Sequence, residues 1–145
     1  MIRSNQILLV VFVSLHCCDV VNWHSHHPHT NYQPQTGVAG YDVGARAALL
    51  KKIYEGLNPG GVLIISEKIH FEDPETQDHI TKLHLDFKRE NGYSELEIAN
   101  KRQAIENVMI TETTKTHIDR LRDCGFVETS CYFQCLNFVS FLSVK

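Results

Sequence analysis

The fold of this chain is decided by residues 47–68, AALLKKIYEGLNPGGVLIISEK. Apolar residues recur at helical spacing as far as Leu57, which predicts a short amphipathic helix over residues 47–57. Pro59 and the two glycines after it end that helix, because proline cannot continue it and glycine tolerates positive φ. Residues 62–66, VLIIS, form a continuous apolar run that is typical of a strand covered on both faces. A helix, a turn and a buried strand are half of an α/β crossover unit, so we expect a layered α/β sheet.

Length and composition place the chain among ordinary globular proteins. Its 145 residues suit one domain, with 43% hydrophobic and 21% charged residues. Fourteen basic and seventeen acidic side chains give a formal net charge of −3, which argues against a broad electrostatic surface for nucleic acid or for an anionic membrane. Five cysteines, an odd number, fit reduced thiols in a cytoplasmic protein better than a disulfide scaffold.

Residues 1–46 differ from the rest, and we expect them to form a poorly ordered leader ahead of a domain at residues 47–145. The apolar run at residues 7–15 is too short to span a bilayer as a helix. It has the outline of a signal peptide but no small-residue cleavage site follows it, and a buried strand is equally compatible. Residues 23–30, WHSHHPHT, could hold a metal weakly, but a histidine-biased linker is favoured and no metal site is predicted.

Helix boundaries are well marked after residue 68. Asp73 is a candidate N-cap with Pro74 at the first helical position, and that helix is expected to end before Asn91. Ser94 and Glu97 have the spacing of a capping box at the start of the next helix. Another helix is expected to begin at residue 113 or 114 and to end at Gly125.

Two strand-like runs close the chain. Residues 126–133 and 138–144 are rich in aromatic and β-branched residues, and the short connection between them predicts a hairpin at the edge of the sheet. The three cysteines in this region, Cys124, Cys131 and Cys135, are expected to be small buried hydrophobes.

Four motifs resemble one family. They are LLKKIYEGLNPGG at residues 49–61, DFKRENGYSELEI at 86–98, KRQAIENVM at 101–109 and FQCLNF at 133–138. Together they are similar to the carboxy-S-adenosyl-L-methionine synthase family over about residues 47–145. The resemblance implies the C-terminal half of a Rossmann-like class I S-adenosylmethionine (SAM)-dependent methyltransferase fold, which ends in an antiparallel β-hairpin.

The same resemblance implies a reaction. The family converts SAM and prephenate into carboxy-SAM and phenylpyruvate, and carboxy-SAM serves the modification of the wobble uridine of tRNA. The family's carboxylate-binding arginine corresponds to Arg102, whose planar guanidinium can donate two parallel hydrogen bonds. From spacing alone Arg102 would be a solvated helix residue. The resemblance also implies a homodimer in which this region reaches the neighbouring subunit's site, and it identifies no catalytic residue here.

The first 46 residues depart from the family pattern. They show no strand followed by a glycine-rich loop, and no acidic residue placed to bind a ribose. We therefore expect a partial copy of the family's domain that lacks these cofactor-binding elements. Two hypotheses stay open: a SAM-dependent carboxy-SAM synthase by descent, or a non-catalytic interaction module that pairs with an intact synthase.

Overall fold

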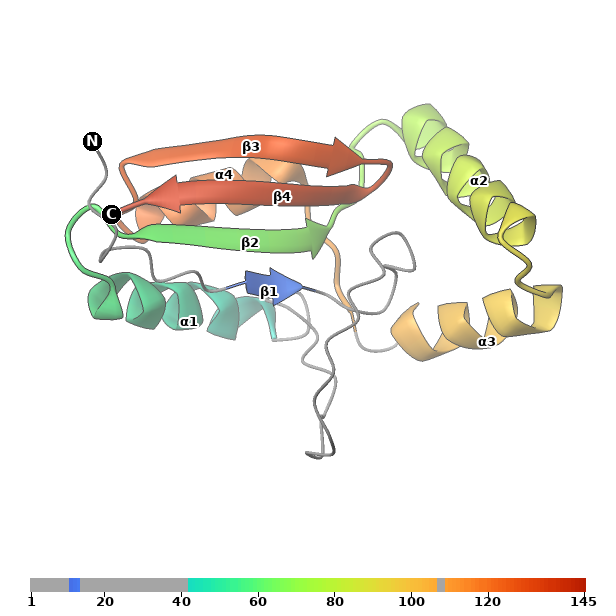
Figure 1. The fold of residues 1–145 in the computed structure, drawn as a ribbon, viewed down its shortest axis with the longest axis horizontal. Coiled ribbons are helices and arrows are strands. Elements are labelled where there is room, and N and C mark those ends of the chain that lie inside the picture. Colours follow the sequence, from blue (N-terminus) through green and yellow to red (C-terminus); the bar gives the residue numbers. More distant parts are fainter. Residues whose placement is uncertain (1–10, 14–41, 107–108) are drawn as a thin grey trace.

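A four-stranded sheet forms the body of the molecule (Figure 1). The computed structural model describes residues 11–13, 42–106 and 109–145. The sheet order is β1-β2-β4-β3, and β1 runs parallel to β2 while β4 is antiparallel to both of its neighbours. The strands are β1 (Val11–Val13), β2 (Val62–Lys68), β3 (Glu128–Cys135) and β4 (Phe138–Val144).

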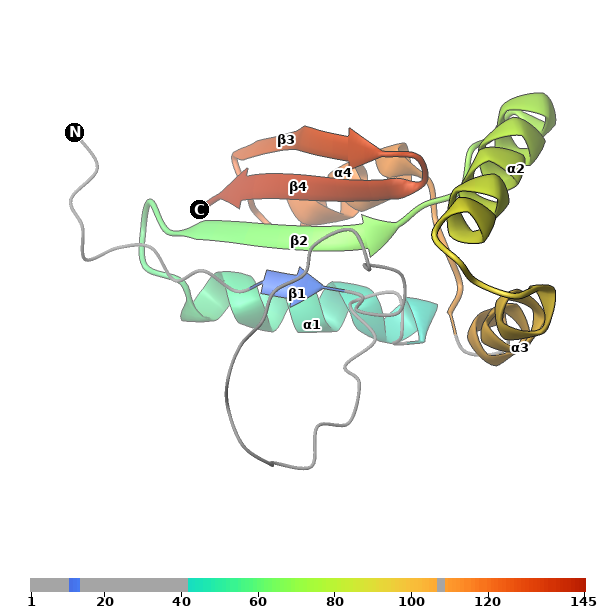
Figure 2. The same cartoon turned by 45° about the vertical axis from the view of Figure 1, so that its right-hand side comes forward.

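The helices fall into two groups. Two of them, α1 (Val43–Gly56) and α4 (Thr114–Asp123), pack on one face of the sheet. The other two, α2 (Pro74–Glu90) and α3 (Glu95–Glu106), project beyond the end of the sheet (Figures 1 and 2). We call α2 and α3 together the arm. No helix in the described part of the chain is long and apolar enough to cross a membrane.

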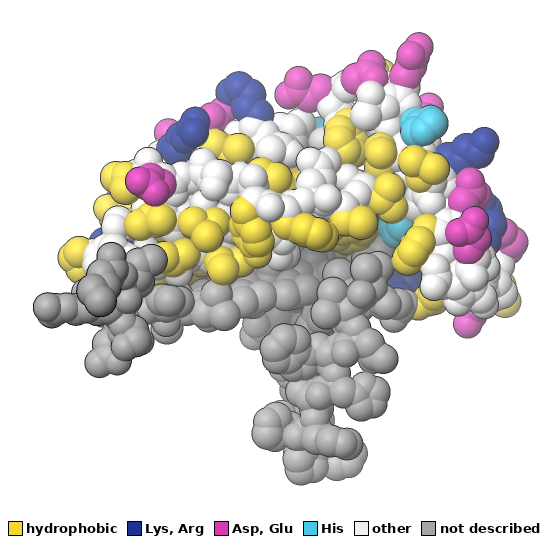
Figure 3. All heavy atoms as spheres, turned by 45° about the horizontal axis from the view of Figure 1, so that its top comes forward, with side chains coloured by type: hydrophobic (Ala, Val, Ile, Leu, Met, Phe, Trp, Pro, Cys, Tyr) yellow, Lys and Arg dark blue, Asp and Glu magenta, His cyan; other side chains and the backbone are white. Residues whose placement is uncertain are grey.

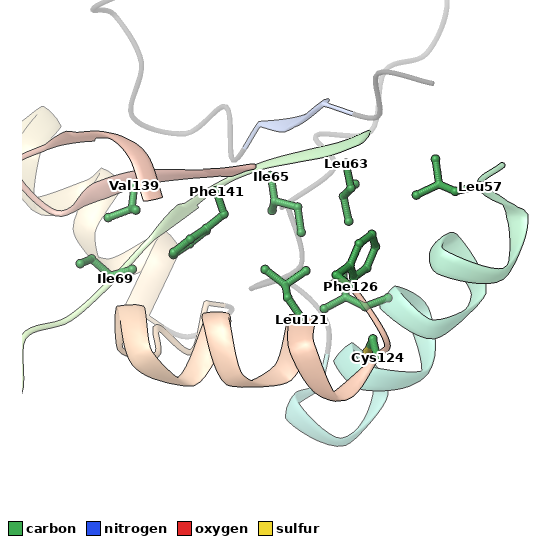
Figure 4. Packing of buried hydrophobic residues seen from close by; sticks show 10 residues of the cluster. Leu57, Leu63, Ile65, Ile69, Leu121, Cys124, Phe126, Val139 and Phe141 are labelled. Carbon is green, nitrogen blue, oxygen red and sulfur yellow. The ribbon is translucent and has the colours of Figure 1, made fainter. Parts of the chain in front are cut away.

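The core lies between the sheet and the pair α1 and α4 (Figure 4). Leu63 and Ile65 of β2, Phe141 of β4 and Leu121 of α4 are each at most 3% exposed. Burial alternates along β2, and every second side chain of that strand is only half-buried. The prediction that residues 62–66 are covered on both faces is therefore wrong for the described residues. Figure 3 shows hydrophobic side chains on the outer surface over the sheet.

The first helix begins earlier than its apolar pattern predicts. α1 starts at Val43 rather than at residue 47. Asp42 caps it, because its carboxylate accepts a hydrogen bond from the amide of Gly44 at 2.9 Å. Residues 43–46 therefore belong to a helix and not to the poorly ordered leader in which the sequence places them. The helix ends at Gly56, ahead of the predicted Pro-Gly-Gly turn.

The predicted caps of the remaining helices are confirmed. Asp73 accepts from the amide of Thr76 at 2.8 Å, with Pro74 in the first turn of α2. The amide of Ser94 donates to the carboxylate of Glu97 at 2.8 Å, which makes the reciprocal half of the capping box. Thr113 caps α4. The side chains of these capping residues accept hydrogen bonds from backbone amides that have no partner inside the helix.

The predicted hairpin is confirmed, with β3 at the edge of the sheet. β3 begins at Glu128 rather than at residue 126, because the side chain of Phe126 is buried in the core ahead of the strand. Cys124 is buried as predicted, whereas the prediction is wrong for Cys131 and Cys135, which are exposed on the edge strand. Exposure follows from their place at the edge, where few side chains can cover them.

Little of the expected leader is described. Residues 11–13, within the apolar run, form β1 beside β2, as the strand interpretation predicts for that part of the run. The histidine-rich residues 23–30 and the other leader residues before Asp42 lie outside the described residues. Within the described residues, no three histidine, cysteine, aspartate or glutamate side chains are grouped in a way that could hold a metal ion.

Candidate functional site

The candidate site lies where the parallel strands end. The arrowheads of β1 and β2 point toward the arm in both ribbon views (Figures 1 and 2). In open α/β sheets, ligands bind in the crevice outside the carboxyl ends of the strands. β2 ends at Lys68, and the chain runs through Ile69 and His70 into the arm. A ligand is therefore expected on this side of the sheet.

Three charged side chains from distant parts of the chain form a buried triad. Arg46 of α1 and Arg120 of α4 each donate to a different carboxylate oxygen of Glu112. Arg46 is fully buried, and the side chains of Arg120 and Glu112 are 12% and 13% exposed. The second terminal nitrogen of Arg46 donates to the carbonyl oxygen of Ile110 at 2.8 Å. The triad ties α1, α4 and the segment between α3 and α4 to one another.

The triad changes the acid–base behaviour of its surroundings. Burial alone would raise the pKa of Glu112, but the hydrogen bonds from Arg120 and Arg46 outweigh it and hold that pKa below the ordinary value. Burial lowers the pKa of nearby His117 to about 4, although the negative charge of Glu112 opposes the shift. The ring of His117 stacks on Phe141 with centroids 5.4 Å apart, and its Nε2 atom has no hydrogen-bond partner among the described residues. Glu112 is thus charged and His117 neutral at pH 7.

The two chain segments that lead into and out of the arm are bonded side by side. Ile69 forms a parallel bridge with Glu112, and the amide of His70 donates to the carbonyl of Glu112 at 3.2 Å. The Nδ1 atom of His70 lies 2.9 Å from the carbonyl oxygen of Thr111. We call residues 69–70 and 110–112 the arm base. The arm base and the triad share Glu112, so the arm is anchored to the helices beneath the sheet.

Arg102 is exposed on α3 and stands apart from the buried triad. The capping box of Ser94 and Glu97 fixes the start of its helix. Arg89 of α2 bonds the carboxylate of Glu95 at 2.6 Å, which joins the two helices of the arm. An exposed guanidinium beyond the carboxyl ends of the strands can bind a carboxylate ligand. The chemistry of Arg102 therefore suits its predicted role.

Basic side chains converge between α2, α3 and the end of β2. Burial and, to a smaller extent, the positive charges of Lys88, Lys68 and Lys101 together lower the pKa of His84 to about 4. His84 also contacts the ring of Phe138 edge-on, with centroids 5.6 Å apart. It is a packed helix residue, as its apolar neighbours in the sequence indicate. Two of these lysines belong to the arm and Lys68 ends β2, and their positive charges favour a nearby anion.

The triad could not be found from the sequence. Arg46 falls in the part of the chain assigned to the leader, and an arginine is usually exposed. The sequence did hold a signal that Arg46 faces the core, because it precedes Leu50 by four residues and Ile53 by seven, on the same helical face. The partner Glu112 is 66 residues away in the chain, and spacing alone cannot connect the two.

Known proteins resemble this chain in fold and in sequence. No protein-family model matches the chain. The sheet, with two parallel strands followed by an antiparallel hairpin, is the α/β arrangement predicted for the C-terminal half of a class I SAM-dependent methyltransferase fold. Among solved structures the chain is similar to PigF with SAH, at a TM-score of 0.47, 16% identity and coverage of 74% of this chain and 28% of that chain. It is also similar to human N-acetylserotonin methyltransferase in complex with SAM, at a TM-score of 0.48, 16% identity and coverage of 74% and 27%.

Curated relatives give a more specific result. Carboxy-S-adenosyl-L-methionine synthase of Ruthia magnifica is 63% identical over 100 residues, which are 69% of this chain and 42% of that protein. The enzymes of that name from Aeromonas salmonicida and Hydrogenovibrio crunogenus are 54% and 56% identical over 104 residues, 72% of this chain in each case and 42% and 41% of theirs. About seven tenths of the chain is thus similar to part of these carboxy-S-adenosyl-L-methionine synthases. It spans about two fifths of the length of these relatives.

Proposed function

We propose that this region serves a carboxy-SAM synthase. The identity of 63% over 100 residues carries the proposal. In it, SAM and prephenate are the substrates, carboxy-SAM and phenylpyruvate are the products, and carboxy-SAM is used in the cytoplasm to modify the wobble uridine of tRNA. The described residues supply Arg102 to the ligand carboxylate, and the lysines around His84 favour an anionic ligand.

The described residues fit one part of such a site. An exposed guanidinium suits the carboxylate of carboxy-SAM, since its planar fork can make two charge-assisted hydrogen bonds. The connections that follow β2 and β3 begin with Ile69 and Leu136 and are not glycine-rich loops. Binding of the remainder of SAM is therefore assigned to residues other than these connections.

The proposal includes a homodimer. Leu83 and Phe87 of α2 are 43% and 40% exposed, and Leu96 of α3 is 70% exposed. Apolar side chains gathered on a projecting pair of helices favour association with another subunit. In a dimer formed through the arm, Arg102 would lie near the neighbouring subunit and could reach a ligand there.

Calorimetric titration of two ligands tests the role of Arg102. Carboxy-SAM carries a carboxylate that SAM lacks, so Arg102→Ala should weaken carboxy-SAM binding by about tenfold to a hundredfold, the effect of losing hydrogen bonds to a charged group. SAM binding should not change. The affinity of Arg102→Lys for carboxy-SAM should lie between those of the unmodified chain and Arg102→Ala, because lysine keeps the positive charge but lacks the planar fork of the guanidinium. Arg122→Ala, at an exposed arginine of α4, is the control. An equal loss for both ligands, or no loss, would contradict the assignment.

A second function is favoured by the exposed apolar side chains of the arm. In this proposal the chain is a non-catalytic module that pairs with an intact synthase. Co-purification with a full-length carboxy-SAM synthase, combined with no binding of carboxy-SAM by the chain alone, would support it. Binding of carboxy-SAM without any association would count against it.

A further inference from the structure

The arm holds the proposed ligand residue, yet the described residues show few contacts between the arm and the body of the molecule. None of the described residues of α2 is buried, and the ring of His84 against Phe138 is a contact between α2 and the sheet. The way in which the two chain ends of the arm are held therefore contributes to the position of α3. These ends are the arm base, residues 69–70 and 110–112.

Arg46 connects the arm base to α1 beneath the sheet. One terminal nitrogen donates to the carboxylate of Glu112, and the other donates to the carbonyl oxygen of Ile110 at 2.8 Å. Both acceptors belong to the segment that returns from α3. Arg46 is fully buried, so these bonds form away from water, where they hold geometry more firmly than they would at a surface.

Two further contacts make the arm base a fixed unit. Arg120 donates to the second carboxylate oxygen of Glu112 and so prevents that side chain from turning away from Arg46. His70 holds the outgoing segment to the returning one through its amide and its Nδ1 atom. Arg46 therefore holds the returning segment directly, through one carboxylate and one backbone carbonyl, and it reaches the outgoing segment through the contacts of His70.

We infer that Arg46 is a positioning residue for Arg102, which it holds in place through the arm base without contacting the ligand. This inference rests on the proposed function for its ligand, since Arg102 matters only if it binds the carboxylate. A misplacement of a binding group by about 1 Å is enough to weaken its effect strongly. Arg46 is thereby part of the ligand site although it lies in the helix below the sheet.

Arg46→Lys is the variant of choice. Removing one member of a buried ion pair altogether is strongly destabilising. Lysine keeps the positive charge for Glu112, but it has no planar fork with which to serve the carbonyl of Ile110 as well. Arg122→Lys makes the same chemical change at an exposed position of α4 and is the matched control.

The first measurement needs no ligand. Amide hydrogen exchange should be about fivefold faster in α3 and at residues 109–112 of Arg46→Lys, while β4 exchanges as in the unmodified chain. The control variant should show neither change. Unchanged exchange in α3 would overturn the inference. Equal acceleration in α3 and β4 would also overturn it, because the whole fold would then have been weakened.

The second measurement is a double-mutant cycle on carboxy-SAM affinity. Arg46→Lys should weaken binding by about fivefold when Arg102 is present and should have no further effect in Arg102→Ala, since the two residues would act through one contact. Additive losses would overturn the positioning role. If Arg102→Ala alone leaves the affinity unchanged, the proposed role of Arg102 fails instead. The exchange experiment then still decides whether Arg46 fixes the arm.

Discussion

Replacing Gly125 with alanine tests how closely the turn after α4 packs against α1. Gly125 has a φ of +113°, which L-residues rarely adopt. A Cβ atom at this position would lie 2.8 Å from Cζ of Tyr54 and 3.1 Å from Cε1. The ring of Tyr54 is held in turn, because it meets Phe126 edge-on at 5.1 Å and the Nζ atom of Lys145 lies 4.6 Å from its centroid. Alanine must therefore displace a ring that has little room to move.

Two costs add at this position. Positive φ costs an L-residue about 1–2 kcal/mol. Forcing extra volume into a packed site costs about 1–3 kcal/mol more. We therefore expect Gly125→Ala to lower the free energy of unfolding by about 2–5 kcal/mol. Gly92 is the matched control, since its φ is +86° but a Cβ atom there would have no neighbour within 4 Å among the described residues. Gly92→Ala should cost only about 1–2 kcal/mol.

Urea unfolding measures the free energy of unfolding of each variant. The values can be compared directly when the slope of that free energy against urea concentration is the same in all of them. The same Gly125→Ala change should also be made in a Tyr54→Ala background, where the overlap is gone. There its cost should fall to the value found at Gly92. Equal costs at the two glycines of the unmodified chain would refute the reasoning, and so would an unchanged cost at Gly125 after the ring is removed.

Two other predictions concern buried and capping residues. The pKa of His117 is about 4 when folded and 6.5 ordinarily, so the unfolded chain binds the extra proton and stability falls as the pH drops from about 6.5 to 4, by on the order of 3 kcal/mol. His117→Phe keeps a ring on Phe141 and should remove that share of the pH dependence in urea unfolding; an unchanged dependence would contradict the assignment. Ser94→Ala should destabilise the start of α3 by about 1 kcal/mol. Faster amide exchange in the first turn of α3, absent from Ser130→Ala on exposed β3, would confirm it.

Local features of the fold could be predicted because their causes lie within a few residues. Asp73 and Ser94 each accept a hydrogen bond from the helix amide three residues away, and the structure shows both bonds. The hairpin was also predictable, since β3 and β4 are joined by a short turn in which Leu136 takes a φ of 53°. Such features depend on short spacings that a sequence displays directly.

Other features depend on contacts between distant residues. Strand order could not be predicted, because periodicity does not show that β4 lies between β2 and β3. The burial of Arg46 depends on Glu112, and an arginine beside alanines gives no sign of such a partner. Glu67 is 1% exposed within β2, although the end of that strand reads as polar. Arg102 is exposed on α3 of the arm, and its role in ligand binding stays a prediction.

The position of β4 also determines when the sheet can form during synthesis. β2 pairs with β4 along its whole length, from Val62 opposite Val144 to Lys68 opposite Phe138. The backbone groups on that edge of β2 therefore stay unpaired until α2, α3, α4 and the hairpin that contains β4 have been synthesised. Pairings between distant segments form slowly, and an open strand edge is a site of aggregation in the interval. The hairpin of β3 and β4 can form first from local contacts and then add to β2 as a unit.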